Sequence, residues 1–433
     1  MASSNSSKRR AVIVGGMRTP FLKAFTEFTQ LDTIALGVAA SRALLAKHDL
    51  PYRAVEGVVW GGVILPSGAP NVGREIALDL KLDPAAEAMT VTRACASGLQ
   101  AVTLAAAAIE RGDADVMIAG GSDSTSNAQV QLPQQFIHAF GPLALGKPAP
   151  SDYLAALAKL GPIGDLLPRR PQIAERTTGE VMGESAERMA QRWEITREAQ
   201  DALALRSHQN AAAAIASGRI ANEVTKVDVG GGKWVHTDGL VRGDTSAEKL
   251  AKLRPAFAED GTVTAGNASP LTDGGAAVLL MSEEKARSLG YKPLAAFKSW
   301  AYVGVDPADQ LLIGPALAVP KALDRAGISL ADCDFVDLHE AFAAQVLCVI
   351  KAMGSAAFAR VKLGRDQAVG EVDPAKLNVR GGSIALGHPF GATGARMVTT
   401  MANELAQSGK QHAVLGICAA GGLGAAAVLE AVR

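Results

Sequence analysis

The sequence predicts an α/β protein made of two similar halves, with a segment of different character inserted between them. Short apolar runs, typical of buried strands, alternate with Ala-rich stretches of helical spacing. This order occurs in the first part of the 433-residue chain and again in its last part. Between them, the chain becomes more polar and is broken by Pro and Gly. A chain of this length also exceeds the usual size of one hydrophobic core, so more than one domain is expected.

The first half begins with a buried strand and contains Cys95 near its centre. Its predicted elements, in order, are a strand at 10–15, an amphipathic helix at 31–48, a connector and strand at 51–62, a strand at 90–94, an Ala-rich helix at 96–111 and a strand at 115–120. Residues 262–281 are again apolar and Gly-rich, and we expect them to complete the sheet of this half.

The second half repeats the pattern of the first. The stretch that begins at Arg42-Ala43-Leu44 resembles the one at Lys321-Ala322-Leu323, and residues 56–60 resemble residues 334–338. The repeat predicts two similar mixed sheets, covered by helices and packed against each other.

The inserted segment starts near residue 127 with loops that Gly and Pro interrupt, and it continues as polar helices at 185–193 and 196–217. It ends near Arg254-Pro255. The predicted domains are therefore residues 1–126 with 261–293, the insert 127–260, and residues 294–433.

Composition and charge exclude several classes of function. Lys plus Arg and Asp plus Glu both number 43, so no global field favours nucleic acid or an anionic membrane. No apolar run is long enough to span a bilayer, and the polar first ten residues lack a secretion signal, which predicts a cytoplasmic protein. The four cysteines never occur as C-x-x-C, so we expect reduced thiols and no metal site. The glycine patterns of ATP and NAD sites are absent.

Two thiols and two imidazoles lie at the ends of strand-like runs. Cys95 stands between a strand and a helix, where the N-terminal N–H groups favour a thiolate. His388, between Gly387 and Pro389, is a candidate base, and His339 ends the strand at 335–338. Cys418 follows the apolar run 413–417 and precedes a Gly-Gly turn, whose N–H groups can hold an oxyanion. Each residue alone would more often be a core or surface residue, but together they predict acyl transfer through a cysteine thioester.

Several motifs in this order resemble the thiolase family from about residue 10 to the C-terminus. They are Ala94-Cys95-Ala96-Ser97-Gly98, His339-Glu340-Ala341-Phe342, Gly387-His388-Pro389, Cys418-Ala419-Ala420-Gly421-Gly422, and the stretches 182–187, 252–257 and 264–269. The pair His339-Glu340, where many members have Asn-Glu, resembles the branch found in the fatty-acid β-oxidation complex, as do residues 166–171 and 370–373.

The resemblance implies a five-layered αβαβα fold and thiolysis of 3-ketoacyl-CoA to acetyl-CoA and a shorter acyl-CoA. In this reaction Cys95 would carry the acyl group, His388 would activate it, and Cys418 would protonate the leaving carbanion. Cys95 and Ala420 would form one oxyanion hole; His388 and a water held at His339 would form the other. Coenzyme A would be a substrate, with no cofactor and no metal.

The resemblance also suggests contacts with coenzyme A and with partner chains. Ser269 and Ala265 would lie near the pantetheine, Met182 at the acyl pocket and Arg242 near the nucleotide phosphates. Val181 replaces a residue that is often His in short-chain members, so acyl length stays open. A homodimer or homotetramer is expected, with the insert as a lid over coenzyme A.

The segment 154–171 alternates apolar residues with Gly and Pro and ends in Arg169-Arg170. It is either part of the lid or a surface for a hydratase/dehydrogenase subunit or a membrane.

Other functions stay open at this point. A biosynthetic acetoacetyl-CoA thiolase would use the same residues in the reverse direction. A ketosynthase-like condensing enzyme would lack the second catalytic cysteine, so Cys418 argues against it. A non-catalytic lipid or coenzyme A carrier would not need all four reactive groups.

Overall fold

The computed structural model describes residues 9–130, 132–160, 162 and 174–433. They fall into two compact units. The main unit has two parts, one that ends at Asn127 and one that begins at Ala174, and the inserted unit lies within residues 128–173. The segment 166–171, with Arg169 and Arg170, lies outside the described residues. The domain boundaries expected from the sequence stay a prediction.

The main unit contains a sheet whose strand order is β10-β11-β12-β9-β1-β8-β5-β3-β4, with β2 paired to β8. The strands of the first half are β1 (Ala11–Arg18), β2 (Leu22–Lys23), β3 (Gly57–Gly61), β4 (Glu87–Val91), β5 (Val116–Asp123) and β8 (Thr272–Ser282). Those of the second half are β9 (Ala295–Gly304), β10 (Phe335–Leu338), β11 (His412–Ala419) and β12 (Leu423–Ala431). As expected, residues 272–282 complete the first half-sheet, between β1 and β5.

The two half-sheets have the same pattern of strand directions. In the first, β3 is parallel to β4 and β5, whereas β8 is antiparallel to β5 and β1. In the second, β10 is parallel to β11, and β12 is antiparallel to β11 and β9. A parallel bridge from Val336 to Leu377 takes the place of β4. The expected repeat is confirmed, but the half-sheets are not separate: β1 and β9 join them through Val12–Ala296 and Ile13–Ala295.

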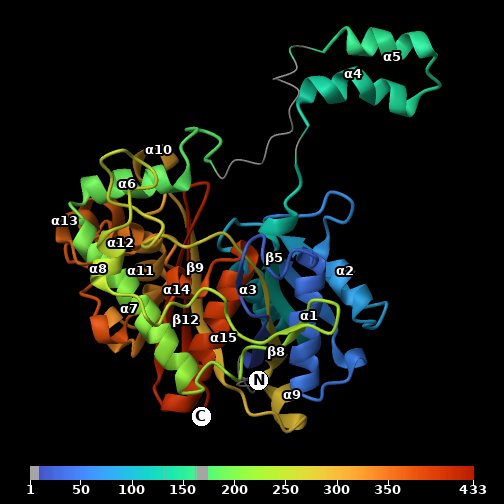
Figure 1. Cartoon of the computed structure of the whole chain (residues 1–433). Coiled ribbons are helices and arrows are strands. Elements are labelled where there is room, and N and C mark those ends of the chain that lie inside the picture. Colours follow the sequence, from blue (N-terminus) through green and yellow to red (C-terminus); the bar gives the residue numbers. More distant parts are fainter. Residues whose placement is uncertain (1–8, 131, 161, 163–173) are drawn as a thin grey trace. The chain divides into compact units, whose positions relative to one another are not determined.

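Helices lie outside and between the half-sheets (Figure 1). Helices α1 (Thr33–Lys47) and α2 (Val72–Asp79) cover the outer face of the first half, and α11 (Pro315–Ala326) and α12 (Ala343–Met353) that of the second. Helices α3 (Ser97–Arg111) and α15 (Phe390–Ser408) share one apolar core with residues of both half-sheets. This arrangement gives layers in the order αβαβα.

The central helices α3 and α15 touch through glycines near their N-termini. A Cβ on Gly98 would lie 2.3 Å from the carbonyl oxygen of Gly391, and a Cβ on Gly394 would lie 2.2 Å from the amide nitrogen of Leu99. Since side chains at these positions would collide with backbone, the glycines permit the close contact. The contact brings the turn before α3, which holds Cys95, next to the turn before α15, which holds His388.

The remaining elements complete the two units. The main unit also contains α6 (Met182–Arg192), α7 (Arg197–Ala216), β6 (Val227–Asp228), β7 (Trp234–Val235), α8 (Ala247–Ala251), α9 (Glu283–Ser288), α10 (Pro307–Gln310), α13 (Ala356–Phe358) and α14 (Ser383–Leu386). In the inserted unit, α4 (Gln134–Leu145) and α5 (Pro150–Leu157) form a helical hairpin (Figure 1). Within the described residues, no helix is both long and apolar enough to cross a membrane.

Candidate active site

Cys95 lies in the tight turn between β4 and α3. The backbone of Ala94 has φ of 45°, which is unusual for a residue with a side chain, and Arg93 and Cys95 form a bridge across the turn. The hydroxyl of Ser97 accepts from the N–H of Arg93 (2.8 Å) and donates to the carbonyl of Ala94 (2.6 Å). These bonds hold the strained turn closed and fix the position of the thiol.

The two imidazoles come from the second half. His339 follows β10 directly and is buried, and His388 is buried in the turn between α14 and α15. Gly387 has φ of 100°, and the hydroxyl of Thr272 accepts from the N–H of His388 at 3.0 Å. The chain therefore turns sharply before His388 and is anchored to β8 at that point.

Thiol and imidazoles meet in one place. The sulfur of Cys95 and one nitrogen each of His339 and His388 all lie within 4.8 Å of one another, and the two ring centroids are 4.2 Å apart. The backbone N–H groups of Ala420 and of Cys95 itself act on the Cys95 thiol and lower its pKa. The donors that the sequence predicts for one oxyanion hole thus converge beside the thiol.

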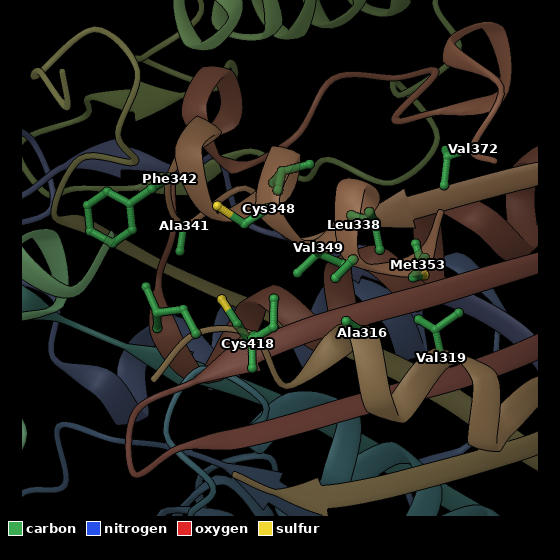
Figure 2. Close-up of a cluster of buried hydrophobic side chains, with 14 of the residues drawn as sticks. Ala316, Val319, Leu338, Ala341, Phe342, Cys348, Val349, Met353, Val372 and Cys418 are labelled. Atoms are coloured by element: carbon green, nitrogen blue, oxygen red, sulfur yellow. The ribbon is translucent and has the colours of Figure 1, made fainter. Parts of the chain in front are cut away.

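Cys418 is the last but one residue of β11 and belongs to the same group. Cys95 contributes to the raised pKa of Cys418, so the two thiols are close to each other. Figure 2 shows Cys418 with Ala341, Phe342 and Cys348, which are members of one apolar core between the second half-sheet and its outer helices. The second thiol is therefore fully buried in apolar surroundings.

Burial raises the pKa of both thiols. It raises the pKa of Cys95 to about 12, although the N–H groups of Ala420 and Cys95 act in the opposite direction. Burial and the neighbouring Cys95 raise the pKa of Cys418 as well. The backbone N–H groups favour the thiolate, as expected from the sequence, but desolvation outweighs them in the free protein. The thiolate has to be formed by a base at the moment of reaction.

His388 is suited to be that base. Burial, with a smaller effect of the Arg396 charge, lowers the pKa of His388 to about 3, so the ring is neutral. Its Nδ1 lies 2.6 Å from the hydroxyl of Thr393, which donates its only hydrogen to the carbonyl of Pro389 at 3.0 Å. With the hydroxyl hydrogen on the Pro389 carbonyl, the hydroxyl accepts from Nδ1, and Nδ1 carries the ring hydrogen. This leaves a lone pair on the buried Nε2, which has no partner among the described residues.

Thiol and imidazole groups are also ligands for zinc. Within the described residues, Cys95, His339 and His388 are the one group of potential ligands that come together. The positive charge of Arg396 acts on both imidazoles and would oppose a bound cation. We therefore assign the group to acid–base and nucleophilic chemistry.

The residues predicted to bind coenzyme A have fewer contacts that tie them to the site. Ser269 is near the site, because its N–H donates to the carbonyl of Ala341 at 2.9 Å. Met182, at the start of α6, packs against the core that contains Cys418. Ala265 and Arg242 are exposed, and the N–H of Arg242 donates to Nδ1 of His208 at 3.1 Å.

The residues that hold the site together are not predicted from the sequence. Thr393 and Ser383 bind the imidazoles, and Glu175 accepts from the N–H of Gly421 at 2.9 Å, next to Ala420. The spacing of Thr393 from His388, one helical turn into α15, could have been found as a signal. Nothing in the sequence connects Glu175 to Gly421.

Comparison with known proteins supports one class of enzyme. Residues 11–284 match the family described as "Thiolase, N-terminal domain", and residues 291–431 match "Thiolase, C-terminal domain". A 3-ketoacyl-CoA thiolase of Photobacterium profundum is 45% identical over 424 residues, which are 98% of this chain and 97% of that protein. One from Salmonella choleraesuis is 45% identical over the same shares.

Solved structures agree with these relatives. The Bacillus anthracis acetyl-CoA acetyltransferase has a TM-score of 0.84 at 33% identity and covers 98% of this chain and 99% of that chain. The human mitochondrial 3-ketoacyl-CoA thiolase in complex with CoA has a TM-score of 0.83 at 29% identity and covers 98% of each chain. The fold and the matches together define this protein as an acyltransferase. The chain belongs to the thiolase family, and the expected thiolase fold and resemblance are confirmed.

Proposed function

We propose that the protein cleaves 3-ketoacyl-CoA with free coenzyme A, giving acetyl-CoA and an acyl-CoA shortened by two carbons. The names of the relatives that match nearly the whole chain support this substrate class. The observation that carries the proposal is the group in which the partly exposed Cys95 meets two buried imidazoles, beside the N–H of Ala420.

In the first half of the reaction, Nε2 of His388 takes the proton of the Cys95 thiol, and the thiolate attacks the keto carbon. The bond between the keto carbon and the neighbouring carbon of the acetyl-CoA portion then breaks. The acetyl-CoA portion keeps the electron pair, and its carbon takes the proton of the Cys418 thiol. Acetyl-CoA leaves, and the acyl group stays on Cys95 as a thioester. The N–H groups of Cys95 and Ala420 hold the negative oxygen formed during attack.

In the second half, the Cys418 thiolate takes the proton of the thiol of coenzyme A. The coenzyme A sulfur attacks the thioester carbon, the acyl–Cys95 bond breaks, and the proton on His388 returns to the Cys95 sulfur. Each proton is thus restored after one cycle. No step uses a metal or a resident cofactor, and coenzyme A is a substrate.

We place coenzyme A along Ser269 and Met182, with Ala265 and Arg242 as outer contacts. Ser269 joins the segment of Ala341, and Met182 borders the core around Cys418, which supports the inner placements. The exposed guanidinium of Arg242 is available to a phosphate.

We further propose a role in fatty-acid β-oxidation in the cytoplasm, as a homo-oligomer with a hydratase/dehydrogenase partner. The identity to 3-ketoacyl-CoA thiolases supports the pathway. The inserted unit supports the partner, because Leu145 and Leu154 of its hairpin are 93% and 69% exposed within the chain. A biosynthetic acetoacetyl-CoA thiolase is the second candidate, since an acetyl-CoA acetyltransferase shares the fold.

Kinetics over a series of 3-ketoacyl-CoA lengths test the proposal. Thiolysis of chains longer than acetoacetyl-CoA with higher kcat/KM supports the degradative role. Activity confined to acetoacetyl-CoA would favour the biosynthetic candidate, and no turnover of any length would leave only a carrier.

A further inference from the structure

The two imidazoles of the site are bound at Nδ1 by hydroxyl groups with different surroundings. The hydroxyl of Thr393 gives its hydrogen to a carbonyl, so it accepts from His388. The hydroxyl of Ser383 lies 3.0 Å from Nδ1 of His339, and its other partner among the described residues is a nitrogen of Arg396 at 3.4 Å. Of these two partners, only the imidazole nitrogen of His339 can accept the hydroxyl hydrogen.

Arg396 can only donate. Its guanidinium has no lone pair to offer, so its contact with Ser383 uses a lone pair of the serine oxygen. The Arg396 side chain is buried in α15, and Asp337 lies 3.5 Å away as its counter-ion. The hydrogen of the Ser383 hydroxyl is then free for one acceptor, and Nδ1 of His339 is the acceptor within reach.

We propose that Ser383, held by the Arg396–Asp337 pair, gives its hydrogen to Nδ1 of His339 and thereby fixes this ring as the tautomer with a hydrogen on Nε2. His339 then presents a hydrogen-bond donor at its buried, otherwise unpartnered Nε2, whereas His388 presents an acceptor. Ser383 is a positioning residue, because it acts through His339.

This opposite polarity has a consequence for the reaction, and it rests on the proposed function. Before attack, the acceptor on His388 faces the Cys95 thiol as a base. The donor on His339 can bind an acyl or enolate oxygen directly, in place of the water expected from the resemblance. Burial, the neighbouring His388 and the Arg396 charge lower the pKa of His339, which keeps it neutral and able to hold a single tautomer.

The tautomers can be measured directly on the unmodified protein. Nitrogen-15 NMR of histidine-labelled protein distinguishes rings with hydrogen on Nδ1 from those with hydrogen on Nε2. The signals of the two rings are assigned by their loss in His339→Asn and His388→Asn. We expect hydrogen on Nε2 of His339 and on Nδ1 of His388. A ring of His339 with hydrogen on Nδ1 would overturn it.

A double-mutant cycle tests the role of Ser383. In the parent protein, Ser383→Ala should lower kcat about tenfold with little change in KM, because His339 loses control of its tautomer. In a His339→Asn background it should cost little, because an amide always offers a donor. An equal loss in both backgrounds would mean that Ser383 is merely structural, and would refute the inference.

A matched control is Ser299→Ala in β9. This substitution removes a buried hydroxyl that donates to the carbonyl of Ala322 in α11 at 2.6 Å. It should leave kcat unchanged. The NMR result does not need turnover. If His339 carries hydrogen on Nε2 and the protein cleaves no thioester, the proposed function fails alone; thiolysis with Nδ1–H on His339 would refute the inference alone.

Discussion

At the scale of single residues, burial sets the chemistry of the site more strongly than the helix N-terminus does. The pKa of Cys95 is raised to about 12 and that of His388 is lowered to about 3, so the pair is neutral at rest. Because both partners stay neutral until the proton is transferred, the free protein avoids the cost of a buried ion pair. We therefore expect the rate of Cys95 acylation to depend on His388 rather than on a resident thiolate.

The neutral, buried His388 makes the folded protein less stable as the pH falls. Its pKa in the native state lies below the ordinary value of 6.5, so the unfolded chain binds the proton more tightly. The free energy of unfolding rises with pH across the window from about 3 to 6.5 and falls as the pH drops through it. For one such group, the slope can reach at most about 1.4 kcal/mol per pH unit. Urea unfolding should show a smaller slope for His388→Asn. An unchanged slope would contradict this assignment.

The second thiol has a separable role. Cys418→Ser should slow exchange of deuterium into the methyl group of acetyl-CoA by roughly 10²- to 10⁴-fold, because that exchange needs its acid–base function. Acylation of Cys95 should be affected less, whereas His388→Ala should chiefly slow acylation. Exchange by Cys418→Ser at the parent rate would refute the role.

At the scale of elements, the contact of α3 with α15 places Cys95 beside His388. Gly394→Ala should lower the free energy of unfolding by about 1–3 kcal/mol and reduce kcat, because the added Cβ meets the backbone of α3. Gly304→Ala, where a Cβ would meet nothing within 4 Å, is the control and should leave both unchanged. Equal effects of the two substitutions would contradict this account.

Most of these elements are predictable from periodicity, but their joining is not. The strand expected at 335–338 has the same bounds in the structure, and the half-repeat is visible in residues 42–44 and 56–60 and their later counterparts. The bridge between β1 and β9 involves two residue pairs, too few to leave a pattern. The thiols and imidazoles stand out as motifs, whereas Ser383 and Glu175 do not, because their partners lie far away in the sequence.

At the scale of the whole molecule, β4 is an edge strand that leads directly to Cys95. Met89 on this strand is 42% exposed in the single chain, and an uncovered edge invites pairing with another strand. We expect a second copy of the chain to cover it. Light scattering should show at least a dimer, and Met89→Lys should shift it toward a monomer with lower activity. A fully active monomeric parent protein would contradict this expectation.

The central claim is that Cys95 carries the acyl group between the two halves of the reaction. The most direct test is incubation of the protein with acetyl-CoA, followed by rapid acid quenching and peptide mass analysis. One acetyl group on the peptide that contains Cys95, absent in Cys95→Ala and retained in Cys348→Ala, is the predicted result. An acetyl group on another residue, with Cys95 free, would contradict the account.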